Sequence, residues 1–128
     1  MRTILVVDDS STIRRMVIAT LQSIPDVKFE EVGNGLEAIE RLAVTSVHLM
    51  LLDLNMPDMH GMELLQFLRS HPAYESLPVV ILTTRGDDTS RAAALSAGAT
   101  RYMTKPFNPA ELIDVVKELL QGVLEKRK

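Results

Sequence analysis

Short apolar runs alternate along this chain with longer stretches in which apolar residues recur at helical spacing. Apolar runs that are rich in β-branched residues and bounded by acids or turn residues are typical of strands buried on both faces of a sheet. The amphipathic stretches between them are typical of helices that cover such a sheet. The predicted strands are residues 3–7, 28–32, 47–52, 77–83 and 100–104, of which the polar run 28–32 is expected at a sheet edge.

Capping residues delimit the predicted helices, because their side chains can accept hydrogen bonds from the free amides of a first turn. The expected caps are Ser11 for the first helix, Asp87 or Asp88 for the fourth and Asn108 for the fifth. Gly98 is expected to end the fourth helix. The positions expected to face inward are Ile13, Met16, Val17, Thr20, Leu21 and Ile24 in the first helix, Leu36, Ile39 and Leu42 in the second, and Leu112, Val116, Leu119 and Leu120 in the last.

A strand followed by a helix, repeated five times, predicts an α/β fold with a five-stranded parallel sheet. Helices are then expected on both faces, in the doubly wound arrangement (βα)5, and the crossovers between parallel strands are expected to be right-handed. The chain of 128 residues is expected to form one domain over residues 1–128.

Composition and charge exclude several classes of function. The net charge of −3 argues against direct binding of nucleic acid or of an anionic membrane. The chain contains no Cys, which excludes a disulfide framework, a thiolate metal site and a Cys nucleophile. Its first apolar run is too short for a signal peptide, and no segment approaches the roughly 20 apolar residues that span a bilayer. A cytoplasmic protein is expected.

Chemically active residues follow four of the five predicted strands. The carboxyl ends of parallel strands lie along one edge of a sheet, where ligands of such folds bind. Taken singly, an acid pair or a Lys-Pro pair after a strand is more often part of a turn. Their joint occurrence at four strand ends favours a site, whose residues are Asp8 and Asp9 after the first strand, Asp53 after the third, Thr83 and Thr84 after the fourth, and Lys105 with Pro106 after the fifth.

Three carboxylates brought close together repel one another unless a cation neutralises them. A cluster of oxygen ligands without His or Cys suits a hard divalent ion, so Mg²⁺ is the expected cofactor. A carboxylate can itself act as a nucleophile and form an aspartyl-phosphate. Asp53 is the candidate for that role, because it follows a long apolar run in which an unpartnered charge would be costly.

Four segments together resemble the response-regulator receiver domain of two-component signalling. They are LVVDDSSTIRRM, LLDLNMPDMHGMELL, ILTT and AGATRYMTKPF, which occur in this order over almost the whole chain. Within that family the chain most resembles the stand-alone chemotaxis regulators. The resemblance implies a flavodoxin-like sheet of order 2-1-3-4-5, which the pattern of apolar runs does not supply.

The resemblance also implies roles for individual residues. Asp53 would accept a phosphoryl group from a histidine kinase, from a phosphotransfer domain, or from a small donor such as acetyl phosphate. Asp9 and Asp53 would hold Mg²⁺ through their side chains and Asn55 through its backbone carbonyl, with Asp8 binding the metal or its water. Lys105 would pair with Asp53 at rest. Thr83, Thr84 and Lys105 would contact the phosphoryl oxygens after phosphorylation.

The switch that the resemblance implies involves the fifth strand. Tyr102 would turn inward after phosphorylation and change the face formed by the fourth helix, the fifth strand and the last helix, which would then bind a downstream protein. The peptide bond between Lys105 and Pro106 would be cis. The side chains of Asn55 and Arg85 would flank the phosphoryl group and help to set its lifetime.

Other interpretations remain open on the sequence alone. The chain could be the receiver of a longer regulator, with the basic segment EKRK leading into a linker. A Mg²⁺-dependent phosphohydrolase would usually carry an acid where Asn55 stands, and a flavin-binding domain would need a phosphate-binding loop where DDSST places two acids. The preferred interpretation is a phospho-acceptor rather than an enzyme, expected as a monomer with a dimer as the alternative.

Overall fold

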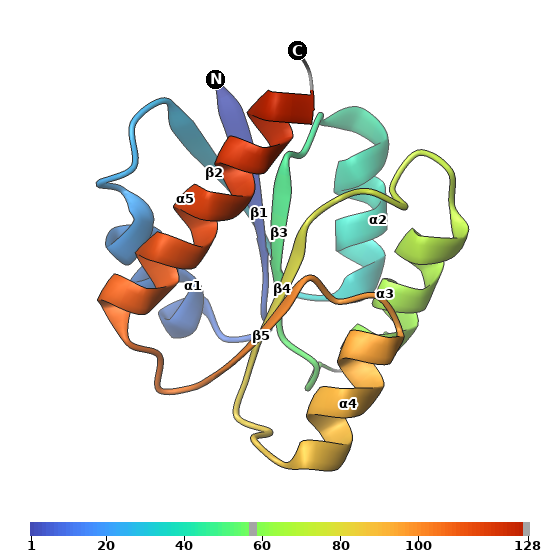
Figure 1. Ribbon diagram of the computed structural model, residues 1–128. Helices are drawn as coiled ribbons and strands as arrows, with labels where there is room; N and C mark the ends of the chain where they lie inside the picture. The colour runs from blue at the N-terminus through green and yellow to red at the C-terminus, as the bar shows by residue number, and fades with distance from the viewer. Residues whose placement is uncertain (57–58, 127–128) are drawn as a thin grey trace.

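The five strands pair in parallel to form one sheet (Figure 1). The computed structural model describes residues 1–56 and 59–126, so Pro57, Asp58 and the basic end Arg127 and Lys128 lie outside the described residues. The strand order is β2-β1-β3-β4-β5, which confirms the order implied by the resemblance and the edge position of the second strand. The strands are β1 (Arg2–Val7), β2 (Val27–Val32), β3 (Leu49–Leu52), β4 (Val79–Thr83) and β5 (Arg101–Thr104).

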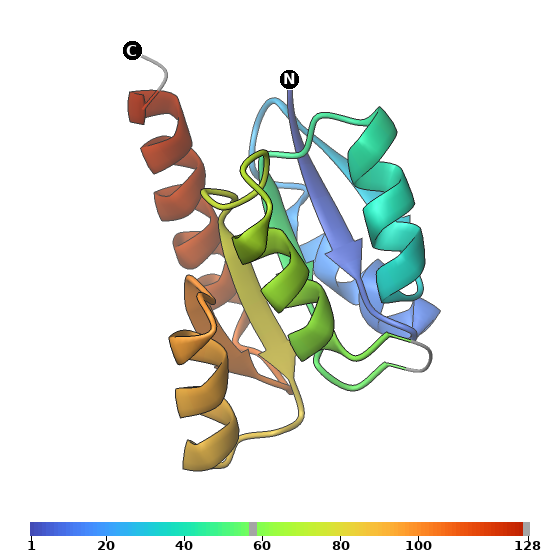
Figure 2. The ribbon, with the colours of Figure 1, turned by 90° about the vertical axis from the view of Figure 1, so that its right-hand side faces the viewer.

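Helices cover both faces of this sheet, as the repeated strand–helix pattern predicts. In Figure 1, α1 and α5 lie on one side of the strands and α2, α3 and α4 on the other, and Figure 2 views the second side. Alternate side chains of each strand enter the two cores, because neighbouring residues of a strand point to opposite faces. The helices are α1 (Ser11–Leu21), α2 (Gly35–Val44), α3 (Gly61–Ser70), α4 (Asp88–Ser96) and α5 (Pro109–Lys126).

Most helix ends follow the capping pattern of the sequence. Asp87 caps α4 and Asn108 accepts a hydrogen bond from the Glu111 amide at 3.1 Å. The first cap is Ser10 and not Ser11 as expected, because the Ser10 hydroxyl reaches the amide of Ile13 at 3.2 Å. The α4 helix ends next to Gly98, whose φ of +109° lies in the left-handed region that glycine adopts without strain.

Two side chains that we expect inside are exposed. Met16 is 51% exposed and Leu36 is 53% exposed. In α2 the buried positions start one residue earlier, at Gly35, where an added Cβ would lie 2.8 Å from the side chain of Met59. The helix therefore approaches its neighbours through small residues, and this close approach turns Leu36 away from the core. None of the helices in the described part of the chain is long and apolar enough to span a membrane.

Candidate functional site

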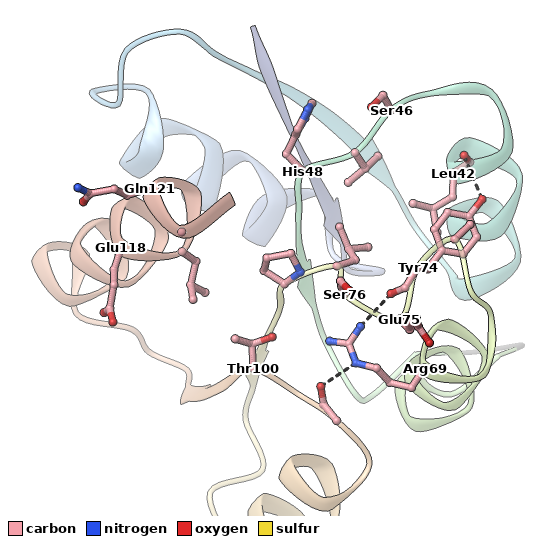
Figure 3. Close-up of a pocket in the computed structure, with 17 residues that line it drawn as sticks. Leu42, Ser46, His48, Arg69, Tyr74, Glu75, Ser76, Thr100, Glu118 and Gln121 are labelled. Atoms are coloured by element: carbon pink, nitrogen blue, oxygen red, sulfur yellow. Dashed lines mark hydrogen bonds between the residues drawn. The ribbon is translucent and has the colours of Figure 1, made fainter. Parts of the chain in front are cut away.

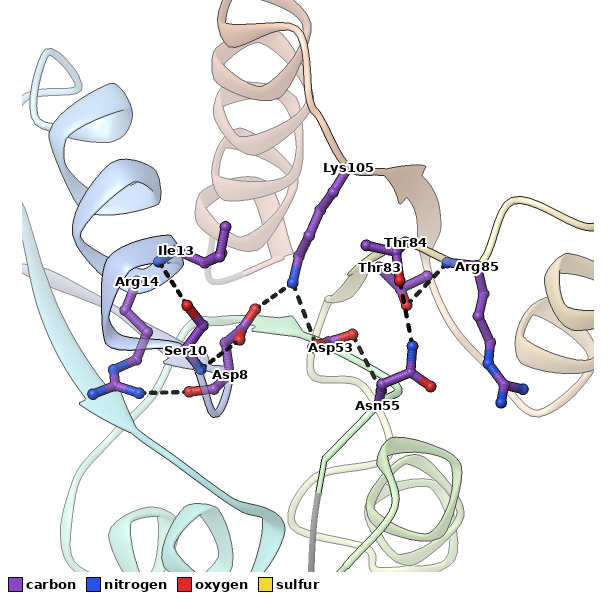
Figure 4. Close-up of polar contacts among 10 residues, drawn as sticks. All are labelled: Asp8, Ser10, Ile13, Arg14, Asp53, Asn55, Thr83, Thr84, Arg85 and Lys105. Carbon is purple, nitrogen blue, oxygen red and sulfur yellow. Dashed lines mark hydrogen bonds and ion pairs between the residues drawn. The ribbon is translucent and has the colours of Figure 1, made fainter.

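The polar residues predicted from the strand ends meet at the carboxyl edge of the sheet (Figure 4). The backbone amides of Asp8, Asp53 and Lys105 continue the hydrogen-bonding pattern of the strands. The sheet therefore holds their main chains on a rigid element and not on a free loop. The bonds run from Asp8 N to Val32 O at 3.2 Å, from Asp53 N to Val7 O at 3.0 Å and from Lys105 N to Thr83 O at 2.8 Å.

Two of the acids are buried and share one cation. Asp8 is 4% exposed and Asp53 is 6% exposed, whereas Asp9 is exposed. The Lys105 ammonium lies 2.6 Å from Asp8 Oδ2 and 3.3 Å from Asp53 Oδ2. Buried carboxylates need such a partner, because losing water without compensation is costly. The resemblance implies pairing with Asp53, and the shorter contact with Asp8 is an addition that the sequence did not predict.

The second oxygen of each buried carboxylate accepts a bond from its own turn. Asp8 Oδ1 accepts from the backbone amide of Ser10 at 2.9 Å, and Asp53 Oδ1 accepts from that of Asn55 at 3.2 Å. Each carboxylate is thus held at both oxygens, by the Lys105 ammonium on one side and by a backbone amide on the other. This double restraint fixes the direction in which the acids point.

The acid cluster has the donor set of a divalent metal site. Asp8, Asp9 and Asp53 each offer an oxygen, and these oxygens lie within 4.8 Å of one another. Three carboxylates and one ammonium leave a charge of −2, which a divalent cation would neutralise. A donor set made only of oxygen atoms suits the hard cations Mg²⁺, Ca²⁺ and Mn²⁺. These residues fit the predicted Mg²⁺.

Thr83 is the last residue of β4, and Thr84 begins the loop that follows it. Thr83 is fully buried, and its hydroxyl accepts a hydrogen bond from the Arg85 amide at 3.4 Å. Thr84 is exposed, and the side-chain amide of Asn55 donates to its hydroxyl at 3.5 Å. This contact links the turn after β3 to the turn after β4. Figure 4 shows the Arg85 guanidinium directed away from Asp53.

Tyr102 lies inward on β5, away from the acids, which is the position that the resemblance implies for the phosphorylated state. Its side chain is 7% exposed, and its hydroxyl donates to the backbone carbonyl of Arg85. The Arg91 guanidinium lies 5.3 Å from the centre of its ring. Burial raises the pKa of the Tyr102 phenol, as does the charge of Asp87, while Arg91 and Arg85 oppose the rise. The peptide bond between Lys105 and Pro106 is cis.

Two residues support the acids without having been predicted. The Arg14 guanidinium donates to the backbone carbonyl of Asp8 at 2.6 Å and pairs with Glu31 at 2.9 Å. Gly61 lies so close to β3 that an added Cβ would be 2.5 Å from the carbonyl oxygen of Asp53. Gly61 could have been suspected from its place at a helix start, but an arginine on an amphipathic helix carries no such signal.

A cavity lies at the opposite end of the sheet from the acids (Figure 3). Its volume is about 910 Å³, and it is lined by loops that precede β3, β4 and β5 and by the last turns of α5. By contrast, the space enclosed beneath Asp8 and Asp53 is only about 10 Å³. A reactant must therefore approach the acids from the solvent side of the strand ends.

Comparisons with known proteins agree on one family. The family profile of the response regulator receiver domain matches residues 4–117. The chain is 39% identical over 122 residues to the chemotaxis protein CheY homolog of Campylobacter jejuni, covering 94% of this chain and 91% of that protein. The structure of chemotaxis protein CheY4 of Vibrio cholerae superposes with a TM-score of 0.84 at 33% identity, covering 93% of this chain and 98% of that one. The Mn²⁺-bound form of response regulator Rcp1 superposes with a TM-score of 0.79 at 29% identity, covering 93% and 91%.

Proposed function

Because the chain belongs to the response regulator receiver domains, we propose that it is a signalling module controlled by phosphorylation of Asp53. The observation that carries this proposal is the environment of that carboxylate. Asp53 is buried at a strand end, contacts the Lys105 ammonium, and shares a small volume with two further acids. A buried carboxylate with these neighbours is suited to act as a nucleophile rather than to stabilise the fold.

In the proposed reaction, a carboxylate oxygen of Asp53 attacks the phosphorus of a phosphohistidine in a histidine kinase or phosphotransfer domain. A new oxygen–phosphorus bond forms while the phosphorus–nitrogen bond breaks, and the imidazole leaves with the electron pair. The Lys105 ammonium lies 3.3 Å from Asp53 Oδ2 and can pair with the negative charge that the phosphoryl group adds. Thr83, at the end of β4, supplies a hydroxyl donor for another phosphoryl oxygen.

Bound Mg²⁺ would supply positive charge toward the phosphoryl oxygens. We assign it to Asp8, Asp9 and Asp53 with the backbone carbonyl of Asn55. The charge of −2 left by the three acids and Lys105 supports this assignment, as does the Mn²⁺ found in the structurally similar regulator Rcp1. Lifetime of the phosphoryl group would then depend on Asn55 and Thr84, whose contact bridges two turns beside Asp53, and on Arg85.

The output of the module would be a change in the α4-β5-α5 face. Thr83, Arg85 and Tyr102 form a connected path, because the Arg85 amide donates to Thr83 and the Arg85 carbonyl accepts from Tyr102. Movement of Thr83 toward a phosphoryl group would therefore act on the turn that holds the Tyr102 hydroxyl. A downstream protein would bind this face, as in a cytoplasmic regulator of the chemotaxis type, with residues 1–128 forming one receiver domain.

The proposal is tested by intact-protein mass after incubation with acetyl phosphate, with and without Mg²⁺. We expect one phosphoryl adduct in the wild type that requires Mg²⁺, and none in Asp53→Asn. Asp114→Asn, an exposed acid on α5, is the matched control and should be labelled like the wild type. Stoichiometric labelling of Asp53→Asn would refute the assignment of the acceptor.

A further inference from the structure

The ring of Tyr102 is enclosed by two different surroundings. One side packs into the core that α2, α3 and α4 form with the sheet. The other meets the Arg91 guanidinium, whose carbon lies 5.3 Å from the ring centre. A cation within about 6 Å of an aromatic ring centre is attracted to the ring face. Arg91 is itself exposed, so a solvent-side residue covers the switch tyrosine.

Helix α4 is weakly anchored, which gives this contact particular weight. The buried side chain of α4 is Ala94, and the rest of its inward surface is also small. Within the described residues the Arg91 guanidinium forms no ion pair with a carboxylate, and its contact is with the ring of Tyr102. The Arg91 side chain thus adds a link between α4 and β5 that the alanine-rich surface of the helix does not provide.

We propose that Arg91 is a positioning residue of the switch, whose guanidinium covers the Tyr102 ring and sets the fraction of molecules in which that ring is inward before any phosphorylation. This inference rests on the proposed function for its meaning, since it assigns the resting bias of the α4-β5-α5 face to one exposed side chain. A chain without Arg91 would start from a larger outward population and would have further to move on activation.

Chemical nitration of the ring measures this population directly. Tetranitromethane nitrates tyrosine through its phenolate, and a ring that is buried reacts only through molecules in which it has turned out. The chain has no Cys to compete for the reagent, and Tyr74 is its one other tyrosine. Because Tyr74 lies elsewhere, with its hydroxyl bonded to the Leu42 carbonyl, its rate is an internal reference.

The variant to compare is Arg91→Met, with Arg101→Met as the matched control. Arg101 lies on the same face and pairs with Glu118, so both changes remove one positive charge from that face. We expect Arg91→Met to raise the Tyr102 nitration rate, relative to that of Tyr74, by about two- to fivefold, the range that an exposed cation–ring contact implies. Arg101→Met should leave the ratio unchanged, and Arg91→Lys should lie between Arg91→Met and the wild type.

The sign of the result separates positioning from simple electrostatics. Arg91 lowers the pKa of the Tyr102 phenol, so losing only its charge would raise that pKa and slow nitration. Faster nitration therefore supports release of the ring, while an unchanged or slower rate in Arg91→Met, or an equal rise in both variants, would overturn the proposal. The assay uses no phosphoryl donor, so its failure is distinct from a failure of Asp53 to become phosphorylated, which the mass measurement reports.

Discussion

The two ends of the sheet differ in how they use polar groups. At the carboxyl edge, Asp8 and Asp53 are buried around Lys105 and enclose a space of only about 10 Å³. At the amino edge, a cavity of about 910 Å³ is open, yet its Arg69 guanidinium is occupied by backbone carbonyls. Cavity size thus points to one end and buried charge to the other. In this chain, buried charge and not cavity volume marks the edge of the sheet to which we assign the proposed chemistry.

At the amino edge, the side chains of Arg69 and His48 form hydrogen bonds with backbone groups of the chain itself. Arg69 donates to the carbonyls of Gly98 at 2.9 Å and Tyr74 at 3.0 Å, which joins two loops. The Nδ1 atom of His48 accepts from the Thr3 amide at 3.0 Å. The carboxyl edge instead holds three acids against one ammonium, and such an excess of one charge is useful only to something that binds there.

The largest effect is expected from a methyl group at the carboxyl edge. In Gly61→Ala the added Cβ would lie 2.5 Å from Asp53 O and 2.7 Å from Leu54 Cα, which are backbone atoms that cannot move aside easily. We expect the free energy of unfolding to fall by about 3 kcal/mol, at the upper end for overpacking. Urea denaturation measures this loss, and a stability equal to that of the wild type would contradict the close approach.

Removal of the shared cation should have the next largest effect. Lys105→Met leaves Asp8 and Asp53 buried beside each other, and we expect a loss of about 2 kcal/mol in the absence of Mg²⁺. Mg²⁺ should recover part of this loss, because it replaces the missing positive charge. Thermal melts with and without Mg²⁺ provide the measurement. Lys117→Met, on the exposed surface of α5, is the control, and equal losses in the two variants would argue against the pairing.

At the amino edge, Arg69→Met should lower stability without touching the chemistry. The variant loses two hydrogen bonds to carbonyls that water in the open cavity can partly replace, so we expect a loss of about 1 kcal/mol. Labelling by acetyl phosphate should proceed as in the wild type. If Arg69→Met folded normally but was not labelled, the two ends of the sheet would be coupled. That result would contradict the separate roles proposed for the two edges.

The smallest expected change in the free energy of unfolding is a gain, whereas Gly61→Ala is expected to lower it. Gly122 lies in α5 beside the amino-edge cavity, and apart from its own helix backbone no atom of the described residues lies within 4 Å of an added Cβ. Gly122→Ala should therefore raise the free energy of unfolding by about 0.5 to 1 kcal/mol, because alanine is the better helix former. Urea denaturation of Gly122→Ala and Gly61→Ala in parallel compares a matched pair of variants. One added methyl group is expected to stabilise the amino edge, and the other is expected to destabilise the carboxyl edge.

Much of the fold could be predicted because apolar runs and caps are local signals. The predicted strand 28–32 agrees with β2 to within one residue, and β3 and β4 begin two residues later than predicted. The order of the strands required the family resemblance, since no local pattern states which strands are neighbours. Family and fold are both confirmed by the comparisons.

The parts that could not be predicted depend on how a helix is rotated against the sheet. Met16 and Leu36 have the spacing of buried residues but are exposed, and in α2 the small residue Gly35 approaches the core more closely than Leu36 does. Arg14 and Arg91 look like ordinary surface arginines in the sequence, and only the packed helices bring them to Asp8 and Tyr102. The acids were predictable because their positions follow from strand ends alone.

The pairing of β1 with β3 has a practical consequence. Val7 lies opposite Leu52, so the next residues along the two strands, Asp8 and Asp53, are brought level with each other. An insertion of one residue within Arg2–Val7 would bring the wrong side chain level with Asp53, even if every apolar residue were kept. Grafting this centre onto another parallel sheet would therefore mean transplanting the alignment of two strands along with the acids, whereas the loops at the far end take no part in that alignment.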